Sequence, residues 1–297
     1  MPFLQLTLEL GKSDPEPVAD ALFAIGALSV TLEDAADDPI LEPAPGALPL
    51  WPTVNIKALF DAATGPQSVV TALQTQLQTP LPTHRFEQLA DRPWEREWLK
   101  DFHPMQFGQR LWICPDGQRP DDPHAIVVDL DPGLAFGTGT HPTTALCLQW
   151  LDQHAPLPAT LIDYGCGSGI LAIAALKLGA QRAVGVDIDP QALLASRDNA
   201  ERNGVSTALS LSLHDVELQP AELLIANILA GPLETLAPRL AALTQTNGHI
   251  VLSGVLTEQA AAVQNCYAAW FEMEPIMRQG DWARLSGKKR AARSSLT

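Results

Sequence analysis

Three glycines at alternating positions, Gly165, Gly167 and Gly169, make up the stretch of this chain best suited to hold a ligand. Glycine has no Cβ, so it turns tightly and lets a bound molecule come close to the main chain. Asp187 follows about twenty residues later, the spacing at which an acid accepts hydrogen bonds from the two hydroxyls of a ribose. Together these residues indicate a site for a ligand that carries a ribose.

The elements around these residues are predicted to be strand, turn, helix and strand. Residues 161–162 belong to a short apolar run typical of a buried parallel strand. Residues 170–178 carry apolar side chains at helical spacing and end at Gly179, a helix C-cap residue. Residues 183–186 form the next strand, which leaves Asp187 at its carboxyl end. Because open α/β sheets bind ligands at the carboxyl ends of their strands, the glycines and the acid are expected at one edge.

The glycine spacing separates two kinds of nucleotide-like ligand. A dinucleotide fingerprint has its third glycine three positions after the second, where this chain has Ile170. Here the third glycine comes one residue early, an acid (Asp163) precedes the first, and no phosphate-binding lysine is present. The pattern resembles the S-adenosylmethionine site of class I methyltransferases. By that resemblance the residues expected to bind S-adenosyl-L-methionine are Gly165, Gly167, Asp187 and Ile188. The alternative is a glycine turn that only packs a helix against a strand.

A second glycine-rich segment, residues 131–144 (DPGLAFGTGTHPTT), precedes a helix predicted over residues 145–154. Helix N-termini offer free N–H groups to an anion such as a carboxylate. No Gly-Lys-Ser/Thr sequence follows, so the segment is not a phosphate loop. A segment this rich in glycine and without apolar periodicity favours a functional loop. The alternative is an ordinary turn capped by Thr143 or Thr144. The candidate cofactor contacts in this segment are Phe136, Gly137, Thr138 and Thr144.

Asn227 is the candidate for the chemistry. It follows an apolar strand predicted over residues 222–226, so its amide lies at the same edge as the glycines. We predict that Asn227 orients a substrate amine without a dedicated base, the amine proton leaving to water. The alternative is an amide that only caps a turn. Asp215, after the preceding strand, either contacts an adenine or is a solvated turn acid.

Composition excludes several classes of protein. The 297 residues carry a net charge of −15, which argues against a nucleic-acid binder, because phosphate contacts need clustered Lys and Arg. No apolar run has membrane-spanning length, and residues 1–30 lack a signal-peptide pattern. The four cysteines are scattered without a C-x-x-C pair, and the seven histidines include no H-E-x-x-H. We therefore expect a cytoplasmic protein that binds neither DNA, membrane nor metal.

The first 90 residues are predicted to form a separate ferredoxin-like α+β domain. Alternating and helical apolar patterns give the order β-α-β-β-α-β. The predicted elements span residues 3–10, 15–25, 28–32, 54–60, 67–77 and 84–89. Residues 1–60 hold nine acidic residues against two lysines, so this domain favours a basic partner.

The remaining segments complete the expected domain plan. Trp94 and Trp98 lie four apart in residues 91–107, which indicates a linker helix whose tryptophans pack on a domain or line a cleft. Strands predicted over residues 110–114 and 125–130 open a second domain that extends to residue 288, and residues 289–297 are a basic, disordered tail.

These motifs together carry a family resemblance. The segments DPGLAFGTGTHPTT, DYGCGSG, GVDIDP, NIL and WEREW resemble those of PrmA-type methyltransferases of bacteria, which modify the large-subunit ribosomal protein L-eleven. The resemblance implies that the cofactor is bound by Thr144, Gly165, Asp187 and Asn227. It also implies that the N-terminal domain holds the free ribosomal protein, and that lysine side chains and an N-terminal amine receive the methyl groups. We expect a monomer.

The expected fold is therefore α/β: a Rossmann-like seven-stranded sheet of the class I methyltransferase type, with an N-terminal ferredoxin-like domain joined by a linker helix. Three other functions stay open on the sequence. They are a class I methyltransferase with a different substrate, a dinucleotide oxidoreductase and a non-catalytic module that only binds the cofactor.

Overall fold

The computed structural model describes residues 3–36, 49–89, 103–115, 117–130, 139–213 and 217–291. The chain divides into two compact units, Met1–Glu97 and Trp98–Thr297. Each unit has its own sheet and its own hydrophobic core.

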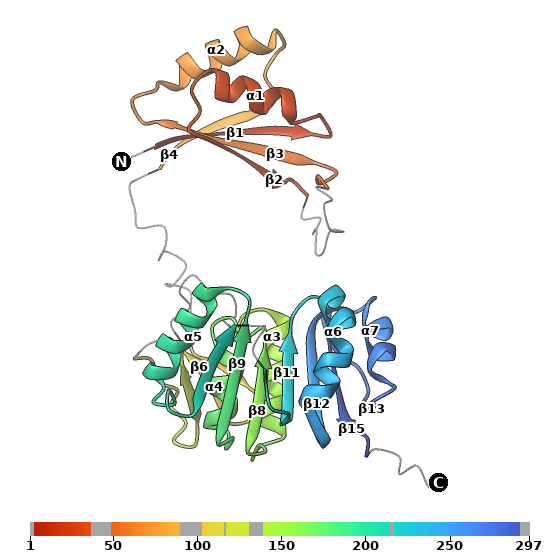
Figure 1. Ribbon diagram of the computed structural model, residues 1–297. Helices are drawn as coiled ribbons and strands as arrows, with labels where there is room; N and C mark the ends of the chain where they lie inside the picture. Colours follow the sequence, from red (N-terminus) through yellow and green to blue (C-terminus); the bar gives the residue numbers. More distant parts are fainter. Residues whose placement is uncertain are drawn as a thin grey trace. The chain divides into compact units, whose positions relative to one another are not determined.

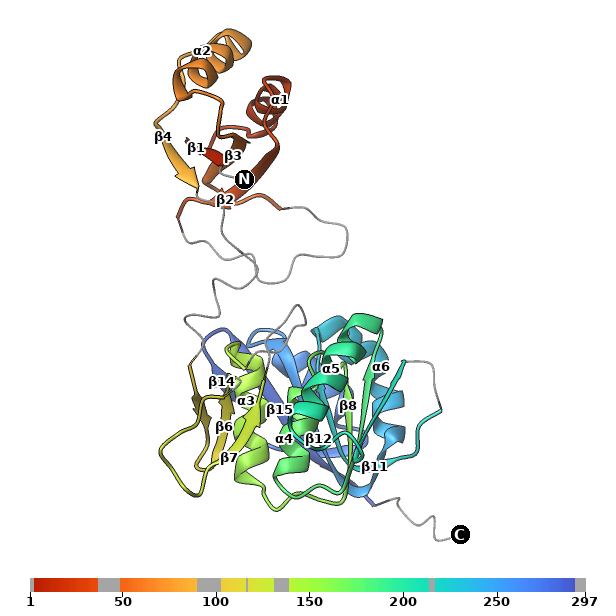
Figure 2. The same cartoon turned by 90° about the vertical axis from the view of Figure 1, so that its left-hand side faces the viewer.

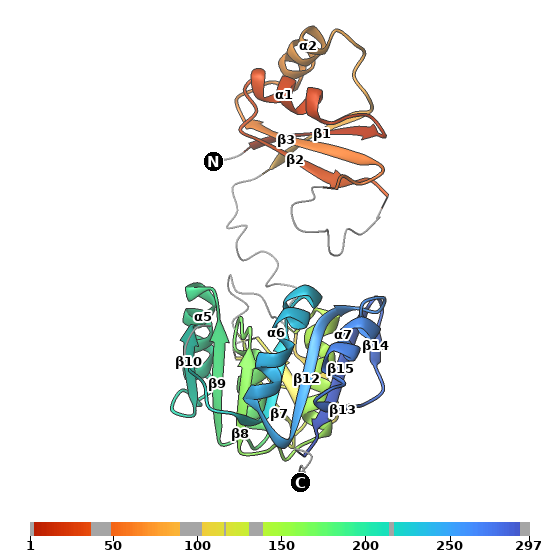
Figure 3. The same ribbon diagram turned by 45° about the vertical axis from the view of Figure 1, so that its right-hand side comes forward.

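The N-terminal unit is a four-stranded antiparallel sheet with two helices on one face (Figures 1 and 3). Its sheet order is β2-β3-β1-β4, and its element order is the β-α-β-β-α-β that the sequence predicts. Alternate residues of β1 (Leu4, Leu6, Leu8) point into the core beneath the helices, as the period of a half-buried strand requires. The elements are β1 Phe3–Gly11, α1 Glu16–Ala24, β2 Ser29–Asp34, β3 Val54–Asp61, α2 Pro66–Leu77 and β4 His84–Leu89.

The other face of this sheet carries many polar side chains together with Phe3, Leu59 and Leu89, and no described helix covers it. Gln5 points to this face, because its neighbours Leu4 and Leu6 point into the core. Glu87 is opposite Gln5, and Glu9 follows Gln5 by four residues on β1, so both glutamates lie on this face, and both are exposed. Lys57 lies on the same face and pairs with Glu33 at 2.7 Å. The face therefore mixes charges of both signs and carries two exposed glutamates.

The second unit is built on a larger mixed sheet with the order β10-β9-β8-β11-β12-β15-β13. The five strands from β10 to β12 are parallel, and β15 runs antiparallel to β12. The strand order reverses between β8 and β11, which is where α/β sheets of this kind bind ligands. The strands are β8 Thr160–Tyr164, β9 Arg182–Asp187, β10 Leu209–Leu213, β11 Ala221–Asn227, β12 Thr244–Leu256, β13 Phe271–Met273, β14 Met277–Gln279 and β15 Trp282–Lys289.

Helices cover both faces of this sheet, as a parallel sheet requires. One core joins α3 (Pro142–Gln153), α4 (Ile170–Lys177) and α5 (Pro190–Arg202) to one face. A second core joins α6 (Ala230–Leu243) and α7 (Ala260–Tyr267) to the other face, as Figure 3 shows. Because α4 is apolar on every side, it is completely enclosed: all residues from Ile170 to Leu176 are buried.

A small three-stranded sheet packs beside α3 (Figure 2). It consists of β5 Met105–Phe107, β6 Leu111–Cys114 and β7 Ile126–Asp129. The buried carboxylate of Asp152 on α3 accepts main-chain N–H groups of Gln109 and Leu111, at 2.5 and 3.1 Å. This carboxylate fixes the turn between β5 and β6 against α3, since a buried charge is stable only when it is fully hydrogen-bonded.

Three predictions of the sequence are wrong. Residues 105–107 are a strand instead of part of a linker helix, whose residues 91–102 lie outside the described residues. The sheet contains eight strands instead of seven, because residues 272–277 divide into β13 and β14 on either side of Pro275, which has no N–H to pair. Lys289 belongs to β15, not to a tail: its Nζ donates to the carbonyl oxygens of Ala241 and Thr244 at 2.5 and 2.6 Å.

Two observations bear on membranes and metals. No helix in the described parts of the chain is both long and apolar enough to cross a membrane. The described residues also contain no cluster of three or more His, Cys, Asp or Glu side chains that could hold a metal ion.

Candidate active site at the carboxyl edge of the sheet

The predicted site residues lie where β8, β9 and β11 end. Tyr164 is in register with Val186, and Asp163 with Ile225, so the three carboxyl ends lie side by side. The glycine turn leaves β8, Asp187 ends β9 and Asn227 ends β11. The register therefore brings these groups, which are up to 62 residues apart in sequence, to one edge of the sheet.

The glycine turn is fixed by main-chain hydrogen bonds. The N–H groups of Gly165 and Cys166 both donate to the carbonyl of Val186 on β9, at 2.7 and 3.0 Å. Gly165, Gly167 and Gly169 all have positive φ angles, of 81°, 54° and 78°, which other residues rarely adopt. Gly169 also caps α4. The turn thus presents main-chain groups and a helix N-terminus toward the edge of the sheet.

Asp187 holds this turn as well as ending its strand. Its Oδ2 accepts the N–H of Gly167 at 2.9 Å, and its Oδ1 accepts the N–H of Asp189 at 3.0 Å. Each carboxylate oxygen has further lone pairs, so Asp187 can still accept hydrogen bonds from two hydroxyls. The next residue, Ile188, leaves 74% of its surface exposed, so its apolar side chain is available to a flat ligand ring.

Asp163 lies beneath the turn and is completely buried. Its Oδ2 accepts the N–H of Ala172 at 3.0 Å, while its Oδ1 has no hydrogen-bond partner among the described residues. Burial raises the pKa of this carboxyl to about 7, with a further rise from the nearby charge of Asp187. A cation bound at the edge of the sheet would favour the ionised form.

Asn227 is joined to the first turn of α3. Its Nδ2 donates to the hydroxyl of Thr144 at 3.2 Å, and Thr144 itself is buried. The helix begins at Pro142 instead of residue 145, and its N-cap is His141, not Thr143 or Thr144. The Nδ1 of His141 accepts the N–H of Thr143, and burial lowers the pKa of this imidazole. His141 therefore fixes the start of α3. Its ring packs edge-on against the ring of Trp282, with 4.7 Å between the two ring centroids.

A contact that local sequence patterns do not reveal holds Ile228, the residue after Asn227. Gly254, which follows β12 residue Ser253, has a φ of 82° and lies directly against the main chain of Ile228. A Cβ at Gly254 would overlap the carbonyl oxygen of Ile228 and lie 2.8 Å from its carbonyl carbon. A Cβ at Gly165 would overlap the Ile228 side chain. Ile228 is thus held between two glycines. Its partners lie 63 and 26 residues away in sequence, so local patterns could not reveal the contact.

The structure thus places six of the predicted site residues at this edge. Thr144 accepts a hydrogen bond from Asn227, and the N–H of Gly167 donates to Asp187. Gly165 lies against Ile228, and Ile188 follows Asp187. Phe136, Gly137, Thr138 and Asp215 lie outside the described residues.

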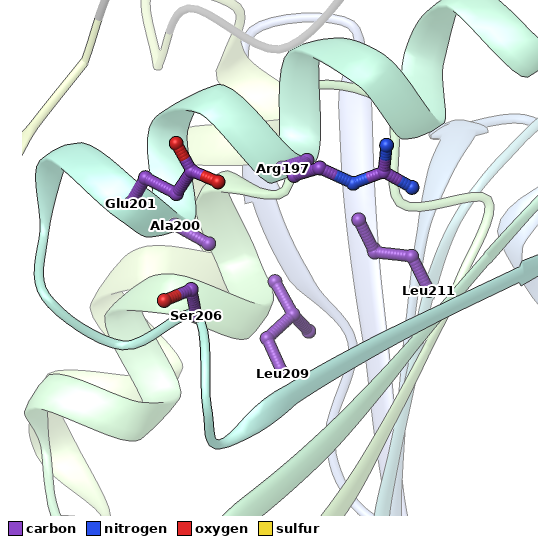
Figure 4. A pocket seen from close by; sticks show the side chains of 6 residues that line it. All are labelled: Arg197, Ala200, Glu201, Ser206, Leu209 and Leu211. Carbon is purple, nitrogen blue, oxygen red and sulfur yellow. The ribbon is translucent and has the colours of Figure 1, made fainter.

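A separate hollow of about 260 Å³ lies between α5 and β10 (Figure 4). Arg197 and Glu201 line it from the helix, and Leu209 and Leu211 line it from the strand. None of the six predicted site residues that the structure describes lines this hollow.

Comparison with known proteins identifies the family. The chain matches the family model described as ribosomal protein L11 methyltransferase (PrmA) over residues 2–290. The chain belongs to this family. The L11 methyltransferase of Serratia proteamaculans is 54% identical over 298 residues, covering 98% of this chain and 100% of that protein. That of Salmonella heidelberg is 52% identical over 296 residues, with the same coverage.

The fold agrees with this family. The crystal structure of the ribosomal protein L11 methylase from Lactobacillus delbrueckii subsp. bulgaricus matches with a TM-score of 0.59 and 33% identity. The match covers 64% of this chain and 100% of the other. The Rossmann-like, class I methyltransferase fold predicted from the glycine motif is therefore confirmed.

The first prediction concerns Gly254. We expect Gly254→Ala to lower kcat of methyl transfer about tenfold or more, because the new Cβ displaces Ile228 and with it Asn227. Gly204→Ala is the matched control: Gly204 also has a positive φ, of 67°, but has no atom within 4 Å of the added Cβ. Both variants carry a similar backbone strain of roughly 1 kcal/mol. Equal kcat values for the two variants, measured at saturating substrates, would contradict a role of Gly254 in placing Asn227.

The second prediction concerns pH. The pKa of Asp163, about 7 in the folded chain, lies above its ordinary value of 3.8, so folding favours the protonated form. The stability that this group contributes is complete below pH ~4 and is lost as the pH rises toward ~7. We expect Asp163→Asn, which imitates the protonated carboxyl, to flatten the fall in unfolding free energy over this interval. Urea titrations of both proteins without cofactor measure it, and an unchanged slope in the variant would contradict it.

Proposed function

We propose that this chain transfers methyl groups from S-adenosylmethionine to lysine side chains and the N-terminal amine of ribosomal protein L11, at the carboxyl edge of its second unit. As a member of the L11 methyltransferase family, the chain is an S-adenosylmethionine-dependent enzyme that methylates this protein. The observation that carries the proposed site is the hydrogen bond from Asn227 to Thr144, which joins the last residue of β11 to the first turn of α3.

The residues at the edge fit the cofactor in shape and charge. S-adenosylmethionine has a ribose, a carboxylate and two positive charges, and when bound it supplies an electrophilic methyl group. Asp187 would accept the ribose hydroxyls, and Ile188 would cover the adenine. The N-terminus of α4 would receive the carboxylate, since a helix start favours an anion, although its Ala172 N–H is already taken by Asp163. The buried carboxylate of Asp163 lies behind the turn and would favour the positive end of the ligand.

Asn227 would orient the amine that is to be methylated. Because Nδ2 donates to Thr144, the amide of Asn227 is fixed with Oδ1 available as an acceptor. An amine that donates one N–H to Oδ1 has its lone pair directed away from Asn227. Fixing this direction is what accelerates a displacement reaction, because the nucleophile must approach in line.

The amine must be neutral before it can react. A lysine amine has a pKa near ~10.4 in water and is mostly protonated at neutral pH. A partly dry site disfavours the ammonium form, so the proton can leave to water before transfer. The imidazole of His141 does not act as the base in this scheme, because its Nδ1 is occupied by the N–H of Thr143.

The third prediction tests Asn227. We expect Asn227→Ala to lower kcat roughly a hundredfold, the usual effect of a misplaced reactant, with a much smaller change in cofactor Kd. Asn227→Gln keeps the amide but changes its reach, so it should recover little of the rate. Stopped reactions analysed by mass spectrometry give kcat, and calorimetry gives Kd. A weaker Kd with an unchanged rate at saturation would remove the orienting role.

The N-terminal unit would recognise the ribosomal protein. A protein that binds RNA carries clustered Lys and Arg side chains, and this unit has a strong excess of acids. Glu9 and Glu87 are exposed on the sheet face that no described helix covers. Opposite charges on two surfaces accelerate their encounter and hold them in register.

The fourth prediction tests that surface. We expect the double variant Glu9→Lys/Glu87→Lys to raise KM for ribosomal protein L11 by about tenfold at low salt and by less at high salt, because salt screens surface charges. The cofactor Kd should not change. The double variant Asp198→Lys/Glu272→Lys makes the same change of net charge on exposed residues of the second unit and is the control. Equal effects of the two double variants would show a response to net charge alone.

The compartment that we propose is the cytoplasm, where ribosomal proteins are made. Cys114, Cys147 and Cys166 are buried free thiols, which suits a reducing environment. Burial raises the pKa of Cys147 to about 12, so this thiol stays protonated.

A further inference from the structure

Helix α5 buries polar side chains where a packing helix ordinarily buries apolar ones. Ser196, Asn199 and Asn203 follow each other by three and four residues and therefore share one helical face. Their exposed fractions are 0%, 2% and 7%. These three residues are called the polar stripe. Buried polar groups are costly unless they are hydrogen-bonded, so the partners of the stripe show what it does.

The first two members of the stripe bind the glycine turn. The hydroxyl of Ser196 donates to the carbonyl of Gly167 at 2.8 Å, and Nδ2 of Asn199 donates to the carbonyl of Ser168 at 3.0 Å. Asp187 accepts the N–H of Gly167 from the other side. Gly167 is thus held through both its N–H and its carbonyl group. Its carbonyl and the next are drawn toward α5, into the protein.

The approach of α5 to the turn is as close as these contacts allow. A Cβ at Gly169 would lie 2.9 Å from the hydroxyl oxygen of Ser196 and 3.2 Å from its Cα. Ser196 Oγ also lies 3.6 Å from the sulfur of Cys166, within the same turn. A larger side chain at position 196 would therefore separate the helix from the turn, and a side chain without a donor would leave the Gly167 carbonyl unpaired.

The third member anchors the same helix to the strand that precedes residues 131–144. Asn203 receives the N–H of Asp129 on Oδ1 at 2.9 Å and donates from Nδ2 to the carbonyl of Asp129 at 2.7 Å. The side-chain amide thus pairs with β7 as a neighbouring strand would. Arg119 holds the carboxylate of Asp129 through two hydrogen bonds, of 2.5 and 2.9 Å. The helix therefore cannot move relative to β7 without breaking buried bonds.

We infer that Ser196 and Asn199 are positioning residues for the cofactor. They fix the carbonyls of Gly167 and Ser168 toward α5, so that the glycine turn is preorganised to bind, and Asn203 holds α5 in place against β7. The inference rests on the proposed placement of the cofactor at the glycine turn. Preorganisation improves affinity because the bound conformation is already populated in the free protein. The methyl transfer step itself takes place at Asn227 and does not involve the stripe.

The fifth prediction follows, and it separates positioning from stability. Ser196→Ala and Asn199→Ala should each raise the cofactor Kd, and KM for the cofactor, about tenfold, as the loss of a preorganising hydrogen bond does. The kcat at saturating cofactor should stay within about twofold, because the orientation of the amine is unchanged. Calorimetry, steady-state kinetics and thermal unfolding are measured on the full-length chain.

Tyr267→Phe is the matched control. The Tyr267 hydroxyl is also buried and donates to a main-chain carbonyl, that of Leu233, at 2.7 Å, but it lies between α6 and α7 on the other face of the sheet. The Tyr267→Phe variant should lower Tm by about as much as Ser196→Ala and Asn199→Ala do, without changing the cofactor Kd. If Ser196→Ala and Asn199→Ala lower Tm and leave Kd unchanged, the stripe is only structural and the inference is overturned.

Asp187→Ala is measured beside them. If Asp187→Ala weakens cofactor binding and the stripe variants do not, the inference fails while the proposed placement stands. If Asp187→Ala also leaves the affinity unchanged, the proposed placement of the cofactor is itself wrong.

Discussion

The close approach of three chain segments around Ile228 is the constraint on which the site depends. Gly165 follows β8 and Gly254 lies within β12. Both lack a Cβ, and Ile228, which follows β11, occupies the space between them. Parallel pairing alone would bring the strand ends to one edge, but it would not fix the turns that follow. Contact on both sides leaves the residue before Ile228 little freedom. The amide of Asn227 is then held at its other end by Thr144. Packing without Cβ atoms thus produces the precision that orienting a nucleophile requires.

At this edge of the sheet, burial affects the ionisation of the acidic side chains more than ion pairs do. Asp163 is completely buried, and one of its oxygens has no hydrogen-bond partner among the described residues. Burial raises its pKa, and the nearby charge of Asp187 raises it further. Two carboxyl groups in such a place are costly for the empty site. The cost is recovered when a cation binds, which links the stability of the fold to the charge of its ligand. A ligand with a negatively charged pyrophosphate would instead be repelled by these two acids. The glycine spacing and the buried acid therefore favour the same class of cofactor for separate physical reasons.

Sequence patterns predicted the parts of the fold that depend on neighbours along the chain. The run from β8 through the glycine turn and α4 to β9 follows from apolar periodicity and from residues that need positive φ. No helix was predicted for residues 230–243, where Gly231, Pro232 and Pro238 favour a turn. The structure forms α6 there, since Pro is tolerated in a first helical turn and the buried face decides the rest. Histidine is not a preferred N-cap, so the start of α3 at Pro142 was also missed. The contact of Gly254 with Ile228 and the bonds of the α5 stripe join segments far apart in sequence, and only the folded chain shows them.

The arrangement also indicates where discrimination between amines has to arise. An amide oxygen that accepts one N–H recognises a lysine side chain and an α-amine equally well, since both present the same donor. A site built on Asn227 and on main-chain groups therefore orients many amines and selects few. Selection requires contacts outside the reacting atoms, which differ from one target to another. The N-terminal unit has a sheet face and a core of its own, and in the function that we propose this unit would supply those contacts. In the proposed function, separating recognition from chemistry in this way would let one fixed site serve several positions on one substrate.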